Sequence, residues 1–440
     1  MNAENPSGDN SIGPEENGPE ENGPEENGPE ENGPEENGPE ENGPDGSSDM
    51  VPRFPQQGFA PNHVDQRRRW VEERTGATLT QVGTFSLDSQ QMRGNIENPI
   101  GAVQMPLGVA GPLLIHGEHA QGTFYVPLAT TEGALVRSYE RGMLAITRAG
   151  GAVARVTMNE NRGSPIFTCQ DVQRAYELTQ FVQENLTSIR AQAESTTGHG
   201  KLLRVTSRLI GRDVVLDFCY HTGDAHGMNM ISKATDAACR WIMEHFPADS
   251  FYVLSGGSSE KRASGMLFAG GKGKYVTAGV RLPSRITKTY FGASPQQLHN
   301  MWQRTILAET SIGTIGYNGH FANGLTALFI ACGQDVANVT NSAVGVTSFD
   351  ITEAGDLYAS VTLPSLTVAT VGGGTAGGTS SECLHILGCQ GDAMAVKLAE
   401  IVVATVLAGE LSFGAALATS EFVNAHERYG RNRPKHPNDQ

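Results

Sequence analysis

The sequence predicts a globular protein that combines strands and helices in one large domain or two intertwined domains. Its 440 residues are 38% apolar, which is enough to bury cores of that size. A β-branched and aromatic run over residues 214–220 predicts a strand, and apolar residues at three- and four-residue spacing between Ile231 and Ile242 predict the helix that follows. A second apolar segment, residues 402–418, predicts a buried helix near the end of the chain.

The first 50 residues form an acidic arm that we predict to be disordered. The pentapeptide Gly-Pro-Glu-Glu-Asn occurs six times in succession from Gly13 to Asn42. The arm holds 16 of the 48 acidic residues and no lysine or arginine, so the other 32 acids and the 32 bases balance. The repeats contain prolines and carboxylates that repel one another, and they have no other apolar side chain to bury. No core is therefore expected to form here. Net charge therefore gives no argument for nucleic acid as a partner, and a solvating arm is favoured over a docking strip for a basic partner.

The folded part is predicted to open with a charged helix over residues 65–74, which Thr75 and Gly76 end. Three consecutive arginines, Arg67 to Arg69, suggest RNA binding at first sight. Acidic residues one turn later favour a solvated helix face instead.

Residues 223–233 connect the predicted strand at 214–220 to its helix and suit a ligand. The glycines let a ligand approach the backbone, and the free N–H groups of the first helical turn favour a phosphate. Asp224 could cap this helix or accept a hydrogen bond from a ribose hydroxyl. Since neither a Walker A pattern nor G-x-G-x-x-G is present, the spacing alone favours an ordinary capped turn.

No segment predicts a membrane span, a targeting peptide or a metal site. The longest uncharged stretch, residues 357–381, is broken by Pro364 and three glycines, and the apolar segment from Ala395 carries charged residues. Six cysteines without a C-x-x-C pair fit reduced thiols in a cytosolic protein better than a zinc site. We therefore expect a soluble, cytoplasmic protein without a metal, with an organellar address as the alternative.

Eight short motifs follow one another along the folded part: residues 97–101, 105–112, 126–133, 223–233, 316–320, 331–335, 370–375 and 406–417. In this order they resemble the signature of the 3-hydroxy-3-methylglutaryl-CoA (HMG-CoA) reductase family, class I in particular, from about Asp65 to Ala425. The resemblance reverses the preference for an ordinary capped turn at Asp224. It implies reduction of an acyl-CoA thioester, HMG-CoA, to mevalonate and free coenzyme A by two hydride transfers from NADPH, for isoprenoid biosynthesis.

The resemblance implies four catalytic side chains. Glu132 in Thr-Thr-Glu-Gly acts in proton transfer, and Lys261 lies on the carbonyl oxygen as the electrophile. Asp335 in Cys-Gly-Gln-Asp lies between the two, keeps the lysine charged and links its proton to Glu132. His426 donates a proton to the coenzyme A thiolate. Such a set suits thioester reduction, which must polarise a carbonyl and protonate a thiolate and an alkoxide.

Residues 255–262, here called the lysine loop, depart from the family pattern. The loop is one residue shorter than usual, Glu260 stands where aspartate is typical, and Arg262 stands where a second lysine is typical. As a cation, Arg262 can bind the free carboxylate of the substrate.

The remaining contacts are also implied by the resemblance. Arg162 pairs with the substrate carboxylate, although the family's Arg-Gly-Pro is Arg-Gly-Ser-Pro here, and Ser255 and Asn323 make polar contacts. The helix segment that lines the coenzyme A channel comprises Ser138, Tyr139, Glu140, Arg141, Gly142, Met143 and Leu144. The coenzyme turn, as we call it, comprises Asp224, Ala225, His226, Gly227, Met228 and Asn229, and Thr197, Gly198 and His199 lie on a neighbouring loop.

Coenzyme choice is where the resemblance and the residues differ. Class I reductases use NADPH and place an arginine near the adenosine ribose, where this chain has Gly198. His199 and Lys201 can supply cations close by. We predict that NADPH stays preferred over NADH by a smaller margin than is usual for the family.

The resemblance further implies an α+β fold. Residues 51–164 and 254–425 form a large helical domain built round a long central helix, and residues 165–253 form an inserted small, ferredoxin-like, NADP-binding domain. Residues 426–440 form a mobile C-terminal segment that starts at the catalytic histidine. In the family, catalytic residues of one subunit meet the coenzyme domain of its neighbour, so we expect a homodimer or homotetramer that is inactive as a monomer, with no membrane or nucleic-acid partner.

Two other functions compete with this one. A catalytically dead relative could act through its acidic arm, but the chain retains all four catalytic residue types. The NAD-linked, oxidative direction from mevalonate is typical of class II, whereas the motifs have class I character.

Overall fold

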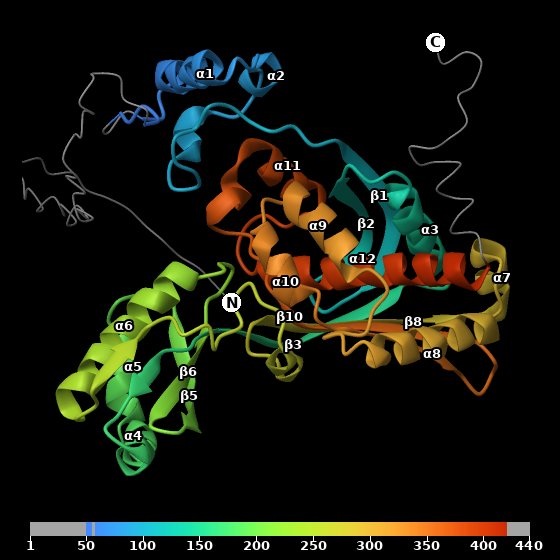
Figure 1. Cartoon of the computed structure of the whole chain (residues 1–440). Coiled ribbons are helices and arrows are strands. Elements are labelled where there is room, and N and C mark those ends of the chain that lie inside the picture. Colours follow the sequence, from blue (N-terminus) through green and yellow to red (C-terminus); the bar gives the residue numbers. More distant parts are fainter. Residues whose placement is uncertain (1–49, 55–57, 420–440) are drawn as a thin grey trace, which may run out of the picture. The chain divides into compact units, whose positions relative to one another are not determined.

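The structure, a computed structural model, describes residues 50–54 and 58–419 (Figure 1). The predicted disordered arm and the C-terminal segment with His426 lie outside the described residues. Residues Met1–Met50 form one unit and Val51–Gln440 a second, to which every element below belongs.

Strands and helices alternate irregularly along the described part of the chain. The strands are β1 (Leu107–His116), β2 (Gln121–Ala129), β3 (Ala152–Gly163), β4 (Ile166–Thr168), β5 (Lys201–Ile210), β6 (Asp213–His221), β7 (Ser250–Tyr252), β8 (Gly273–Leu282), β9 (Val346–Ile351) and β10 (Leu357–Leu366). The helices are α1 (Pro61–Thr75), α2 (Thr80–Gly83), α3 (Leu135–Arg148), α4 (Val172–Glu184), α5 (Leu186–Glu194), α6 (Met228–His245), α7 (Ser284–Phe291), α8 (Pro295–Ser311), α9 (Phe321–Ala331), α10 (Val339–Ser342), α11 (Gly378–Ile386) and α12 (Met394–Ala418).

Strand β3 joins two groups of strands. Along the sheet the order is β7-β4-β6-β3-β8-β10-β9, with β1 beside β3, β2 beside β1 and β5 beside β6. The first part of β3, Val153 to Glu160, pairs antiparallel with β8, and its last three residues, Asn161 to Gly163, pair with β6. The end of β3 therefore lies where the two groups meet, and this junction holds part of the site described below.

A separate hydrophobic core lies under β4 to β7. Alternate residues of β6, from Val214 to Tyr220, face Ile231, Ala234 and Ala238 of α6 in this core. The strands are all antiparallel in the order β7-β4-β6-β5, and the chain order is β-α-β-β-α-β if α4 and α5 count together. That arrangement is of the ferredoxin-like type. It falls within the segment 165–253, whose exact boundaries stay a prediction.

The second core surrounds α12 and corrects the prediction of a large helical domain. The predicted helix at 402–418 is present and begins earlier, at Met394. In Figure 1 it runs between α3 and α9 on one side and β3, β8 and β10 on the other, and it packs against all of them. Six strands thus belong to the described part of this domain. They were missed because β8 pairs with β3 and β10 across long stretches of chain, which no local pattern in the sequence reports.

Helix α12 is long and apolar enough to cross a membrane, but 83% of its most apolar window is buried inside the protein, as befits a core helix. Its two buried carboxylates are satisfied locally. Glu400 accepts hydrogen bonds from the backbone N–H groups of residues 118–120, in the turn between β1 and β2. Glu410 accepts from the backbone of Gly319 and His320 at the start of α9. Buried charges that are paired in this way hold neighbouring turns in place without stranding a polar group.

Helix α1 is confirmed, with Gly76 in the left-handed conformation at its C-terminus. It begins earlier than predicted because Pro61 suits the first turn of a helix. The predicted solvated face is confirmed for Arg69, whose side chain is 71% exposed. For Arg67 the prediction is wrong, because this residue is only 3% exposed. Arg67 donates hydrogen bonds to the carbonyls of Pro52 and Gly58.

A carboxylate on α8 predicts a pH-dependent stability. One oxygen of Glu309 is buried without a hydrogen-bond partner among the described residues, and burial, then the charge of Glu410, raises the pKa of Glu309 to about 7 from 4.5. The folded state therefore holds a proton that the unfolded chain has lost between about pH 4.5 and 7. The stability due to this proton is complete below pH 4.5 and lost as the pH rises through 7.

We expect Glu309→Gln, which stays neutral, to raise the thermal midpoint at pH 8 and to change it little near pH 4.5. Glu353→Gln removes an exposed loop carboxylate and serves as the control, with no comparable pH dependence. A midpoint difference for Glu309→Gln that is the same at both pH values would contradict the assignment.

Candidate active site

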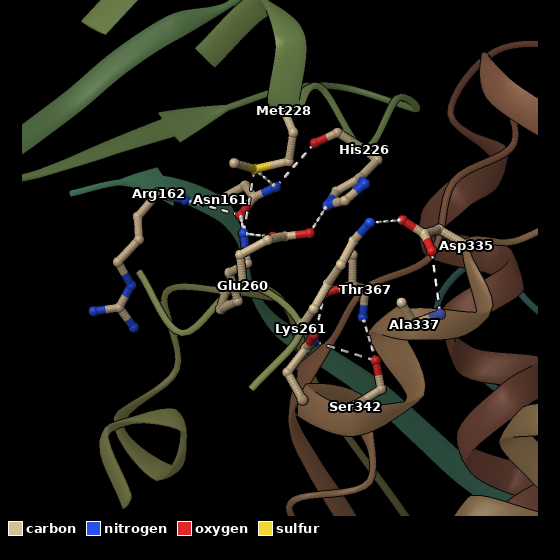
Figure 2. A network of polar contacts seen from close by, with 12 residues as sticks. Asn161, Arg162, His226, Met228, Glu260, Lys261, Asp335, Ala337, Ser342 and Thr367 are labelled. Atoms are coloured by element: carbon tan, nitrogen blue, oxygen red, sulfur yellow. Dashed lines mark hydrogen bonds and ion pairs between the residues drawn. The ribbon is translucent and has the colours of Figure 1, made fainter. Parts of the chain in front are cut away.

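An open cavity of about 640 Å³ lies between the coenzyme turn, the lysine loop and the glycine-rich residues 372–374. We call it the reaction cavity. Its walls bring together the turn residues from Ala225 to Asn229 with Lys261 and Asp335, which are far apart in sequence. Figure 2 shows Lys261 and Asp335 pointing toward one another beside His226.

Lys261 is held in an unusual backbone conformation. Its backbone φ is 54° and that of Ser259 is 59°, values that residues other than glycine rarely adopt. The base of the loop is fixed by Ser255, whose hydroxyl donates to the carbonyl of Ser164 (2.6 Å) and accepts from the N–H of Gly257 (3.1 Å). The predicted role of Ser255 in binding substrate stays a prediction, and its observed role is to anchor the loop.

Lys261 and Asp335 form an ion pair with 2.7 Å between Nζ and Oδ2. The other oxygen of Asp335 accepts from the N–H of Ala337 (3.1 Å), so the carboxylate is oriented by its own turn. The hydrogen bond with Asp335 raises the pKa of Lys261 above its ordinary value. Lys261 therefore presents a positive charge to the cavity, which is what an oxyanion needs.

Behind the lysine loop lies a buried contact that the motifs did not reveal. Lys272 is fully buried, and its ammonium group pairs with Glu260 and donates to Oδ1 of Asn161 (2.8 Å). Burial would raise the pKa of the Glu260 carboxyl, but contact with His226 and the charge of Lys272 lower it to about 2. Glu260 is thus a permanent anion. The only signal in the sequence was a lysine between glycines, which is too common to be informative.

Glu132 lies at a different place from Asp335. Its carboxylate accepts from Nδ2 of Asn323 at 3.1 and 3.3 Å, at the first turn of α9, whereas Asp335 follows the last turn of that helix. Eleven helical residues span roughly 16 Å. Within the described part of one chain, Asp335 therefore does not link Lys261 to Glu132, because α9 lies between the two carboxylates. The predicted link between the three residues stays a prediction.

Asp224 caps a different helix from the one predicted. Its carboxylate accepts from the backbone N–H groups of Ala393 (2.6 Å) and Ala395 (2.8 Å) at the start of α12. Helix α6 instead begins after Gly227, whose φ of 76° requires glycine, and it has no side-chain cap. The proposed contact of Asp224 with a ribose stays a prediction.

The start of α6 fits a dinucleotide. Because no side chain caps it, N–H groups of its first turn are free to face a phosphate. Across the cavity, Cβ atoms added to Gly372 or Gly373 would meet nothing within 4 Å, so this wall leaves room for a ligand. A β-bridge between Ala225 and Val371 ties the two walls together.

The loop with Thr197, Gly198 and His199 lies beside this helix start. The Thr197 hydroxyl accepts from the N–H groups of His199 and Gly200, and Gly200 lies against Met230 of α6. Lys201 is less available than predicted, because its ammonium group pairs with Glu194 at 3.3 Å.

Of the two arginines predicted to bind the substrate carboxylate, one needs correction. Arg162 is 5% exposed and donates to the carbonyls of Gly270 (2.5 Å) and Gly271 (3.1 Å), and in Figure 2 its guanidinium points away from Lys261. The motif could not show that this arginine is turned into the protein to hold a turn. Arg262 is exposed, donates to the carbonyl of Glu260 (3.1 Å) and stays available for a carboxylate.

The helix segment predicted to line the coenzyme A channel is α3, and three of its residues face the core instead. Tyr139, Gly142 and Met143 are buried. Tyr139 fits between α9 and α12 because Gly324 and Gly409 have no Cβ that would overlap its ring or hydroxyl. Packing against α12 thus explains why these three residues are buried. The prediction that they contact coenzyme A is wrong.

The other residues of that segment lie at the edge of the core. Ser138 and Arg141 both contact Ser412 of α12, at 2.9 and 3.0 Å from its hydroxyl. Glu140 pairs with Arg137 at 2.8 Å, and Leu144 is half-buried. Contact with coenzyme A stays a prediction for these four residues.

A charged lysine that faces a helix start suited to a dinucleotide defines an oxidoreductase that acts on a carbonyl group. Comparison with known proteins specifies the family: the model of hydroxymethylglutaryl-coenzyme A reductase matches residues 63–431. The chain belongs to the HMG-CoA reductase family and is an oxidoreductase that reduces HMG-CoA in the mevalonate pathway.

Curated relatives agree with this assignment. The chain is 42% identical over 373 residues to 3-hydroxy-3-methylglutaryl-coenzyme A reductase of Methanocaldococcus jannaschii, with 83% of this chain and 92% of the relative covered. The Pyrococcus horikoshii enzyme is 42% identical over 374 residues (83% and 91% covered). Reductase 3 of rice is 35% identical over 378 residues, with 83% of this chain and 67% of the rice protein covered.

Solved structures show the same fold. A class II HMG-CoA reductase of Streptococcus pneumoniae bound to NADPH has a TM-score of 0.59 at 19% identity, with 80% of this chain and 82% of that chain covered. A second structure of the S. pneumoniae enzyme has a TM-score of 0.61 at 19% identity (83% and 99% covered). The expected coenzyme, NADPH, is consistent with the family.

Proposed function

We propose that the reaction cavity is the reduction site of a class I, NADPH-dependent HMG-CoA reductase. The observation that carries the proposal is the 2.7 Å pair of Lys261 and Asp335 in a cavity whose opposite wall is the coenzyme turn. Class I is supported by identities of 35–42% with archaeal and plant relatives against 19% with a class II structure. A cytoplasmic location is part of the proposal, supported by six buried cysteines without disulfides.

The residues of the cavity have separate tasks. NADPH supplies the hydrides when it is bound along the start of α6 and residues 372–374. Lys261 donates a hydrogen bond to the thioester carbonyl and stabilises the negative charge that grows on its oxygen. Asp335 keeps Lys261 charged and aimed. The same pair then serves the aldehyde, whose reduction places negative charge on the corresponding oxygen.

The separation of Glu132 from Lys261 supports a homodimeric site. Within one chain the Glu132–Asn323 pair and the Lys261–Asp335 pair lie at opposite ends of α9. A second copy that presents its Glu132 to the reaction cavity would complete the proton-transfer set. Each active site of the dimer would thus combine Lys261 and Asp335 of one subunit with Glu132 of the other.

Subunit exchange tests this assignment. Glu132→Gln and Lys261→Gln should each be nearly inactive alone. After they are mixed and exchanged at random, half of the dimers are mixed and each has one intact site, so about a quarter of wild-type activity should return.

The control mixes Lys261→Gln with Asp335→Asn, two changes in the same half-site, which cannot complement one another. Recovery in the control, or none in the Glu132 mixture when tagged subunits prove exchange, would overturn the shared site.

Coenzyme preference gives a further prediction. A Cβ at Gly198 would meet nothing within 4 Å, so Gly198→Arg should fit and bring a guanidinium near the adenosine ribose. A charge-assisted hydrogen bond to the 2′-phosphate adds roughly 1.5–3 kcal/mol, or about one to two orders of magnitude in kcat/KM for NADPH over NADH. Lys201 already pairs with Glu194, so Lys201→Met should change the ratio of kcat/KM for NADPH over NADH little. If the unmodified enzyme favours NADH outright, the NAD-linked oxidative function becomes the better proposal.

A further inference from the structure

His226 belongs to the coenzyme turn, but its side chain faces the lysine loop. The imidazole Nε2 lies 3.6 Å from Oε1 of Glu260. One ring nitrogen also lies within 4.8 Å of a carboxylate oxygen of Asp335. Figure 2 shows the ring between the two carboxylates and beside the end of Lys261. A residue expected only to hold the coenzyme thus reaches the groups proposed for the reduction.

His226 also takes part in a closed ring of contacts with Asn161, Lys272 and Glu260. Nδ2 of Asn161 donates to the carbonyl of His226 (2.9 Å), and Oδ1 of Asn161 accepts from Lys272 (2.8 Å). Lys272 pairs with Glu260, which faces the imidazole of His226. The ring connects the coenzyme turn, the end of β3, the lysine loop and the residue before β8. Because Lys272 is fully buried, moving Glu260 away would leave an unpaired charge inside the protein.

This ring of contacts affects the backbone conformation of Lys261. Lys261 follows Glu260 directly and has a φ of 54°, a conformation that persists only where the surroundings hold it. Contacts of Glu260 with His226 and Lys272 supply that hold. Among these contacting residues, His226 is the one whose imidazole lies in the reaction cavity, and its side chain is 24% exposed.

Charged groups of both signs surround the imidazole of His226. Facing it are the carboxylates of Glu260 and Asp335 and the ammonium groups of Lys261 and Lys272, while the guanidinium of Arg162 points away. The spacing of His226, Glu260 and Asp335 would also suit a metal ion. Each carboxylate already pairs with an ammonium group, so little negative charge is left for a divalent cation.

We propose that His226 is a positioning residue whose imidazole, in contact with Glu260, helps to fix Lys261 against Asp335. The inference rests on the proposed roles of Lys261 and Asp335. It adds a side chain that works through the lysine loop, separate from any contact with the coenzyme.

Two variants test the role. His226→Gln keeps a side chain that can donate a hydrogen bond to Glu260, so kcat should stay within a few fold of the wild-type value. His226→Met removes the contact with Glu260 and should lower kcat about 10–100-fold at every pH, the size expected for a misplaced catalytic group. The NADPH dissociation constant, measured by fluorescence without substrate, should stay near the wild-type value in both.

The matched control is His245→Gln, at the exposed end of the same helix, which should leave kcat unchanged. If His226→Met fails to fold, His226→Ala, which also lacks the contact with Glu260, is measured instead. A wild-type kcat in a folded variant without the contact, or a loss of NADPH affinity as large as the loss of activity, would overturn the positioning role. If Lys261→Gln retains turnover, the proposed site itself fails. If that variant is inactive while His226→Met keeps the wild-type kcat, only the present inference fails.

Discussion

Lys261→Gln should lower kcat for HMG-CoA reduction about 10²–10³-fold, the usual cost of losing one donor to an oxyanion. Glutamine lacks the charge that Asp335 maintains at 2.7 Å, and its shorter side chain does not reach the position of the lysine ammonium group. NADPH affinity should change little, because the coenzyme is expected at the start of α6. The measurements are kcat from coenzyme absorbance and the NADPH dissociation constant from fluorescence.

Lys288→Gln, an exposed lysine on α7, is the control and should behave as wild type. Turnover within a few fold of wild type in Lys261→Gln would remove this lysine from the chemistry. The electrophile would then have to be sought among the other cations near the cavity, with exposed Arg262 first.

His426→Gln should slow thioester reduction by ~10²–10⁴-fold, as expected for a lost general acid, and spare the reduction of free mevaldehyde. The reason is chemical: only the first half of the reaction releases a thiolate that needs a proton. His426 lies outside the described residues, so this role is inferred from sequence resemblance. The assay compares HMG-CoA and mevaldehyde as substrates for the same preparation.

His385→Gln, an exposed histidine on α11, should leave both rates unchanged. Equal losses in the two assays would mean that His426 supports binding or assembly and does not protonate the thiolate.

Local patterns in the sequence predicted the elements that depend on local rules. The strand at 214–220 and the helix after it are present, because alternation and helical spacing both point to the core under β6 and α6. The buried helix near the C-terminus was also found. The strands around α12 were missed, because β8 pairs with β3 and β10 across long stretches of chain that no local pattern reports.

The site was predictable where a motif carries chemistry and unpredictable where burial decides. Lys261 and Asp335 meet as the motifs imply. The buried contact of Lys272 with Asn161 was missed because the two residues are 111 residues apart and the pairing of β3 with β8 brings them together. Arg162 was placed on the substrate, yet in the fold its guanidinium is buried against a turn.

The decisive measurement for a working reductase is the ratio of NADPH oxidised to coenzyme A thiol released, taken on the full chain with HMG-CoA as substrate. Reducing a thioester to an alcohol requires two hydride transfers, so we expect about two NADPH per thiol and mevalonate as the product. A ratio of about one, with an aldehyde as the product, would contradict completion of both steps at this site. No oxidation of NADPH above background would contradict the assignment as a working reductase.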